Sequence, residues 1–193
     1  MNEPAERNAF QLDGIVPWGR RLDEYAAFFA LAGEPRRWPA IIDVGAGPAS
    51  FAAEAAQRGA RVVAVDPLYR CGGDAIRRRY ATTREPMEDG MQRAADRFRW
   101  DFYPSPADVL RRRDEAIHLF LEDYEWGRAC GRYVEGALPR LPFRDGNFGL
   151  ALVSHLLFLY GHKLDAAFHV PLSLTVAPRH LVWRRIIAEV FVE

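Results

Sequence analysis

Two aspartates and two glycines stand at the ends of neighbouring apolar segments. The stretch IIDVGAG, residues 41–47, passes from an apolar run through Asp43 into Gly45 and Gly47. After an alanine-rich segment, a second apolar run ends in Asp66. Glycine permits positive φ and close approach of the backbone to a ligand. An acidic residue about 20 positions further on can accept hydrogen bonds from ribose hydroxyls, so the spacing favours a ribose-bearing cofactor.

The turn lacks the third glycine of dinucleotide-binding patterns. That glycine would stand at Ala49 or Ser50, depending on the pattern, and Pro48 also removes one N–H donor. A pyrophosphate needs such donors, whereas S-adenosylmethionine (SAM) has an amine, a carboxylate and a ribose but no phosphate. Asp43 would repel a phosphate and help to orient a cationic amine. We therefore favour SAM over NAD(P) or FAD; the alternative is a glycine turn and a solvated aspartate with no ligand.

This site needs a strand, a turn, a helix and a second strand. Residues 40–45 and 61–66 are predicted as buried strands, with a helix at 49–59 between them. Such a unit is almost always right-handed with parallel strands. Upstream, residues 20–33 have helical spacing that stops at Gly33, within an N-terminal segment and helix covering 1–37.

A long excursion follows the second strand. Residues 67–131 hold two helical patterns, 73–98 and 106–127, which is more chain than a crossover needs. We interpret the excursion as a helical lid insertion that excludes water from the cleft. Further strands are predicted at 132–138 and from 148 onward. Residues interpreted as building the lid are Trp18, Arg20, Tyr25, Asp123, Tyr124 and Glu125.

Several segments carry a resemblance to a known family. DVGAGPASF, GARVVAVDPLY and RYVEGALPRLPFRDGNFGLALVSHLLFLY resemble class I SAM-dependent methyltransferases. VPWGRRLDEY and LEDYEWGRACGRYV are similar to bacterial methyltransferase-like proteins of undefined substrate, and the resemblance covers about residues 15–169. It implies an α/β fold with a Rossmann-like sheet of parallel strands flanked by helices. It also implies that Asp43, Gly45 and Gly47 line the methionine end of SAM, Asp66 holds the ribose, and Pro67 and Leu68 face the adenine.

The sequence departs from the family pattern at three places. Ala137 stands where many relatives have an acid near the adenine amine, and a backbone contact at Leu138 would replace it. Gly149 replaces the aspartate that usually enters the fourth strand. The resemblance fades after about residue 170, so we expect a sheet without its last strands, whose exposed edge offers a surface for a homodimer.

Candidates for the chemistry follow the fourth predicted strand. Methyl transfer is an in-line displacement that needs alignment of the methyl donor with the acceptor atom. It also needs a base where the acceptor is protonated. His155 is the first candidate for a general base or substrate contact, followed by Tyr160 and Ser154; the alternative for each is a packed, hydrogen-bonded side chain. No Cys-x-x-Cys pair is present, and we predict no metal site.

Composition narrows the class of protein. The 193 residues form one predicted domain with no formal net charge and 49% hydrophobic residues. Two cysteines and no apolar leader indicate a cytoplasmic protein that does not enter a membrane. Arginine runs at 77–79 and 111–113 are interspersed with acids, which indicates ion pairs rather than a nucleic-acid surface. We therefore predict a SAM-dependent methyltransferase with a small-molecule acceptor; an inactive or truncated scaffold and an RNA methyltransferase are the alternatives.

Overall fold

The structure, a computed structural model, describes residues 17–138 and 140–153. In this part of the chain a parallel sheet has the strand order β3-β2-β1-β4. Each strand pairs in register with its neighbour, so Asp43 of β1 lies beside Ala64 of β2 and Leu152 of β4. The predicted α/β fold with parallel strands and flanking helices is confirmed. The strands are β1 (Ile41–Val44), β2 (Val62–Val65), β3 (Tyr133–Val134) and β4 (Leu150–Val153).

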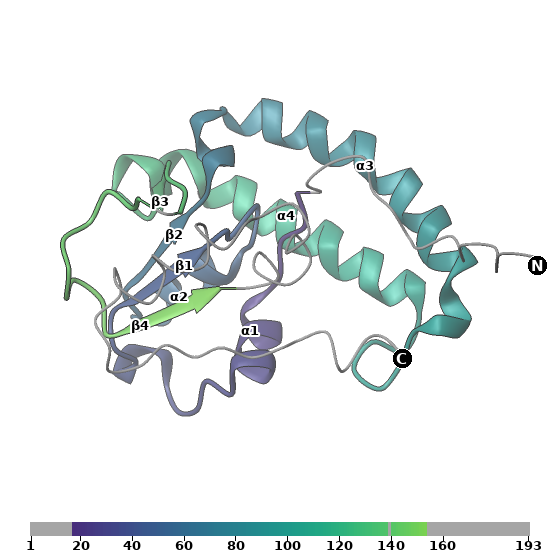
Figure 1. Cartoon of the computed structure of the whole chain (residues 1–193), viewed down its shortest axis with the longest axis horizontal. Coiled ribbons are helices and arrows are strands. Elements are labelled where there is room, and N and C mark those ends of the chain that lie inside the picture. The colour runs from purple at the N-terminus through teal and green to yellow at the C-terminus, as the bar shows by residue number, and fades with distance from the viewer. Residues whose placement is uncertain (1–16, 139, 154–193) are drawn as a thin grey trace, which may run out of the picture.

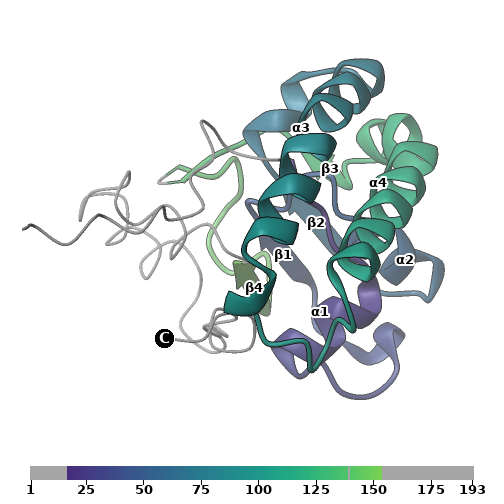
Figure 2. The same ribbon diagram turned by 90° about the vertical axis from the view of Figure 1, so that its right-hand side faces the viewer.

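Three helices cover one face of the sheet (Figure 2). They are α1 (Leu22–Phe29), α2 (Phe51–Gln57) and α4 (Pro106–Ala129). Side chains alternate along a strand, so Ile41 and Asp43 point toward these helices while Ile42 and Val44 point away. The main hydrophobic core fills the space between the helices and this face.

The excursion divides into two helices with different places in the fold. Helix α4 leads directly into β3, and its buried side chains Phe120 and Tyr124 pack into the main core. It is therefore the crossover helix of the sheet. Helix α3 (Gly73–Arg93) runs along α4 (Figure 1) and is the additional element. Short 3-10 turns complete the described chain: η1 (Pro35–Arg37), η2 (Pro67–Arg70) and η3 (Ala95–Arg97).

Helix α1 is shorter than its apolar spacing predicts. It ends at Phe29, followed by Ala30 in the left-handed conformation with φ of 51°. The N–H of Leu31 donates to the carbonyl of Ala26 at 3.0 Å, which satisfies a carbonyl of the last turn. The helix is therefore closed before the chain reaches Gly33.

The entry to β4 explains the glycine at position 149. The Gly149 N–H donates to the Ala40 carbonyl at 2.9 Å, which brings the two segments together. A Cβ at Gly149 would lie 2.8 Å from the Cβ of Pro39. A side chain such as the aspartate of the family pattern would collide with Pro39 here unless one of the two segments moved.

The opposite face of the sheet carries a second apolar cluster, which includes Ile42, Val65 and Ala151. Phe143 and Phe148 pack against it from the segment before β4. Among the helices of the described chain, none combines the length and apolar character needed to cross a membrane.

Candidate functional site

In the turn between β1 and α2, the backbone N–H groups donate to acceptors at the end of β2. Gly45 and Gly47 have positive φ, 71° and 57°, as a tight strand-to-helix turn requires. The N–H groups of Gly45 and Ala46 donate to the carbonyl of Val65 at 2.8 and 3.4 Å. The Gly47 N–H donates to Asp66 at 2.9 Å. With a proline next, the turn offers no series of free N–H groups to a phosphate.

Asp66 closes the turn against the end of β2. Its Oδ2 accepts from Gly47 and its Oδ1 from the N–H of Leu68 at 2.7 Å. Burial raises the pKa of Asp66, and these two N–H groups oppose the shift. Each carboxylate oxygen has a second lone pair, so Asp66 can still accept from hydroxyl groups of a ligand. The adjoining Pro67 is exposed, and Leu68 is half-buried against the main core.

Asp43 is enclosed beneath α1. Its side chain is fully buried, and its Oδ2 accepts from the Tyr25 hydroxyl at 2.7 Å. Its Oδ1 is buried and has no hydrogen-bond partner in the described part of the chain. Burial raises the pKa of Asp43 to about 7; the hydrogen bond from Tyr25 opposes the shift, Asp66 adds to it, and Arg20 opposes it. The carboxyl group is thus part of the turn region but closed to solvent.

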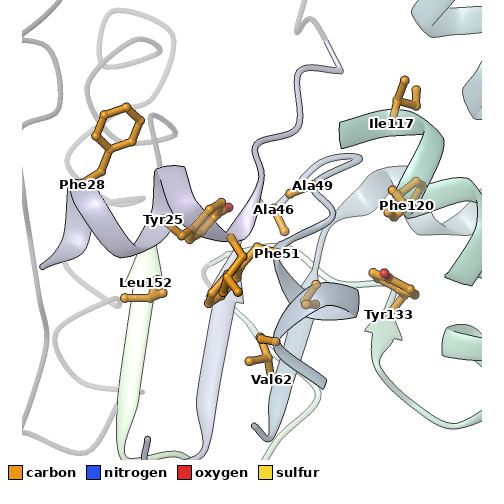
Figure 3. Packing of buried hydrophobic residues seen from close by; sticks show 14 of the residues in the cluster. Tyr25, Phe28, Ala46, Ala49, Phe51, Val62, Ile117, Phe120, Tyr133 and Leu152 are labelled. Carbon is orange, nitrogen blue, oxygen red and sulfur yellow. The ribbon is translucent and has the colours of Figure 1, made fainter. Parts of the chain in front are cut away.

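Residues 17–21, named here the N-terminal strap, lie directly over the turn (Figure 3). A Cβ on Gly19 would stand 2.0 Å from the carbonyl oxygen of Pro48, so the strap and the turn are in backbone contact. The carbonyl of Trp18 lies 3.9 Å from the place of a Cβ on Gly47. The sequence pattern predicts Trp18 in a lid over the cleft but carries no signal for the backbone contact between the strap and the glycine turn.

The lid residues fall into two groups. Trp18, Arg20 and Tyr25 lie at the strap and α1, beside the turn, as the contacts of Tyr25 with Asp43 show. The other three lie on α4 and have structural partners elsewhere. Asp123 pairs with Arg132, the Tyr124 hydroxyl donates to the carbonyl of Cys71 at 2.8 Å, and Glu125 accepts from the N–H of Gly73 at 3.2 Å.

Of the remaining predicted residues, one lies on the other face of the sheet and the others lie outside the described part of the chain. Leu138 is buried in the second apolar cluster with Val65, on the face opposite to Asp43. Its neighbour Ala137 forms an antiparallel bridge with Arg140. His155, Tyr160 and Ser154 lie outside the described residues.

Two further residues support the turn and were not predicted. The Tyr69 hydroxyl donates to the Gly47 carbonyl at 2.6 Å. Glu54, in the first turn of α2, accepts from the Ser50 hydroxyl at 2.6 Å and from the N–H of Leu22 at 3.2 Å. The four-residue spacing of Ser50 and Glu54 was the available signal for this second pair.

No protein-family model and no solved structure matches the chain. An uncharacterized protein of Methanocaldococcus jannaschii is 29% identical over 159 residues, which cover 82% of this chain and 71% of that protein. The description of that protein assigns no activity.

Proposed function

We propose that this protein is a class I, Rossmann-like, SAM-dependent methyltransferase that acts on a small-molecule acceptor. One observation carries the proposal. The backbone N–H groups of residues 45–47 already donate to acceptors within the protein, and the carboxyl groups of Asp43 and Asp66 lie on either side of the turn. These features disfavour a phosphate and favour a ligand with cationic groups and ribose hydroxyls. SAM has an ammonium, a sulfonium and a ribose, and no phosphate.

The start of α2 also favours a ligand without a phosphate group. A helix start usually attracts anions, but here Glu54 already places a carboxylate in the first turn. That carboxylate is buried and accepts hydrogen bonds from the Ser50 hydroxyl and the Leu22 N–H. The same carboxylate pairs with Arg21 at 3.4 Å. A pyrophosphate would place further negative charge beside this carboxylate, whereas a phosphate-free ligand would not.

The sheet order supports a ligand at this place. Strand β1 lies between β2 and β4, so the chain leaves β1 toward one side of the sheet and later returns on the other. Ligands of open parallel sheets bind outside the carboxyl ends of the strands at such a switch point. Val44 and Val153, the last residues of β1 and β4, pair directly beside Gly45.

Each residue of the site then has a defined task. Gly45 and Gly47 let the ligand approach the backbone closely, and Asp66 orients the ribose through its remaining lone pairs. Asp43 balances the charge of an ammonium group. SAM would supply an electrophilic methyl group. The strap excludes water from the turn, and a base, where the acceptor needs one, is still predicted at His155 or Tyr160.

The arginine run at 111–113 supports a small-molecule acceptor over RNA. Arg111 pairs with Asp108 and Glu115 on its own helix. Arg112 pairs with Asp23 and Arg113 with Glu24, both on α1. The charges of this run are thus neutralised within the protein and do not form the basic surface that RNA requires.

Calorimetric titration with SAM and S-adenosylhomocysteine tests the proposal. We expect micromolar binding, weakened at least tenfold by Asp66→Ala and unchanged by Asp89→Ala, a control on the exposed side of α3. Asp66→Asn keeps one oxygen for the backbone N–H groups and serves as the variant if Asp66→Ala does not fold. A folded wild-type protein that binds neither compound contradicts the cofactor assignment, and tighter binding of NAD would favour a dinucleotide. Binding without transfer to any compound of an acceptor panel would favour a scaffold.

A further inference from the structure

Tyr25 and Asp43 form a buried pair that joins α1 to the strand before the glycine turn. The hydroxyl of Tyr25 donates to Oδ2 of Asp43 at 2.7 Å, and both residues are buried. The ring of Tyr25 stacks on Phe51 with 4.1 Å between centroids and parallel planes (Figure 3). The hydroxyl is therefore held in place by ring packing as well as by its hydrogen bond.

The surroundings of Asp43 combine apolar walls with a few charged groups. Its strand neighbours on the same face are Ala64 and Leu152, neither of which ionises. The titratable or charged groups that face it are Tyr25 from α1, Arg20 from the strap, Asp66 from the end of β2 and Tyr69 from η2.

One oxygen of Asp43 is left without a donor in the described chain. Oδ2 has its hydrogen bond from Tyr25, but Oδ1 is buried and has none. A buried carboxylate oxygen that lacks a donor is costly, and such groups commonly mark a place for a ligand, an ion or a water molecule. The position directly before the turn makes a ligand donor the natural partner.

We propose that Tyr25 is a positioning residue for the cofactor: its hydroxyl holds Asp43 so that Oδ1 receives the ammonium group of the ligand, and binding strengthens as Asp43 ionises. This inference rests on the proposed function and deepens it, because it makes the N-terminal helix part of the cofactor site. A purely structural role for Tyr25 would affect stability without changing how binding depends on pH.

The pH dependence follows from the geometry. With a pKa of about 7, Asp43 ionises near neutral pH, and the ionised form attracts the ammonium group. The Tyr25 hydroxyl stabilises the ionised form, so its removal raises the pKa of Asp43 further. Since a hydrogen bond to a charged group is a strong one, we expect the midpoint of the affinity profile to move upward by about one pH unit or more.

The experiment measures S-adenosylhomocysteine binding by calorimetry from pH 5.5 to 8.5. Tyr25→Phe removes the hydroxyl and keeps the ring stack. Tyr80→Phe is the matched control, because the Tyr80 hydroxyl donates to Asp114 at the same 2.7 Å but between α3 and α4. Asp43→Asn removes the titrating group itself. Titration of the ligand is common to all proteins and cancels in their comparison.

The expected result is a profile shifted to higher pH in Tyr25→Phe, unshifted in Tyr80→Phe and flattened in Asp43→Asn. For a shift of one pH unit, the loss of affinity in Tyr25→Phe at pH 7 is expected to be about fivefold, and larger for a larger shift. A profile of Tyr25→Phe that coincides with that of a binding-competent wild type overturns this inference and leaves the proposed function standing. Absence of binding by the wild type at every pH contradicts the proposed function itself, and this inference with it.

Discussion

Asp43 lies in an environment that costs stability. A carboxyl group without solvent contact and with one unpartnered oxygen is unfavourable when ionised. A protein selected for stability alone could place an apolar residue or an amide there. The presence of an ionisable group at the penultimate residue of β1 is consistent with a role in ligand binding, because functional residues often lower the stability of a protein.

Replacement of Asp43 by Asn should stabilise the protein, and more at pH 8 than at pH 5. The pKa of Asp43 is raised on folding from the ordinary 3.8 to about 7, so the folded state binds more protons than the unfolded state between these values. The contribution of this carboxyl to stability is complete below about pH 4 and is lost as the pH rises through 7. The stability gained on substitution should therefore grow by about 2–3 kcal/mol from pH 5 to pH 8.

Urea unfolding of both proteins at pH 5, 6.5 and 8 measures this difference. The raised pKa of Asp66 contributes with the same sign, but it is common to both proteins and cancels. Asp89→Asn on the exposed side of α3 is the control. A gain that is the same at all three pH values would show that Asp43 titrates as an ordinary aspartate.

At the scale of elements, a buried ion pair joins α1 to α4. Arg113 donates to Glu24 at 2.6 and 3.1 Å, and both side chains are almost completely buried. The hydroxyl of Tyr103 donates to the same carboxylate, and Arg113 also donates to the carbonyl of Gly19 at 2.9 Å. This network connects the crossover helix, the N-terminal helix and the strap, and most of its polar atoms find partners in one another.

Arg113→Met should cost about 3–5 kcal/mol of stability, because the Glu24 carboxylate is then buried without its countercharge. The double variant Arg113→Met with Glu24→Gln should recover much of the loss. Arg111→Met is the control on the same helix; Arg111 is exposed, and its pairs with Asp108 and Glu115 should contribute little. Denaturant unfolding of the three variants measures the effect. Equal losses in Arg113→Met and Arg111→Met would contradict a stabilising role for the buried network.

At the scale of the whole molecule, the strap links the crossover helix α4 to the glycine turn. Arg113 of α4 donates a hydrogen bond to the Gly19 carbonyl, and the backbone of Gly19 contacts the Pro48 carbonyl. Segments far apart in the sequence therefore meet at the place where the ligand is proposed to bind. Displacement of the strap should expose the turn without unfolding the sheet.

Gly19→Ala tests this arrangement, since its Cβ would stand 2.0 Å from the Pro48 oxygen and force the strap away. We expect faster trypsin cleavage after Arg20 and Arg21, identified by the mass of the products, with little change in the circular dichroism spectrum. Gly72→Ala is the control, because a Cβ there meets no atom within 4 Å. Cleavage at the wild-type rate in Gly19→Ala would show that the strap does not depend on this contact.

The sequence by itself determined the elements and the residues of the turn. Apolar runs, glycines and the position of Asp66 act within a few residues of one another, so the order strand, turn, helix, strand was predictable and is confirmed. The α/β class followed, because two buried strands joined by a helix are parallel. Identification of the ligand at the turn is still a prediction.

Tertiary structure alone decided how the turn is covered and which groups face it. The hydrogen bond from Tyr25 to Asp43 joins residues 18 positions apart in the sequence, and the hydrogen bond from Arg113 to Glu24 joins residues 89 positions apart. Likewise, only packing shows that α4 is the crossover helix and that a side chain at position 149 would collide with Pro39. Periodicity and propensity report the local chain, whereas these contacts arise when distant segments share one core. The physical reason is that burial, and with it the pKa of Asp43, is a property of the packed fold.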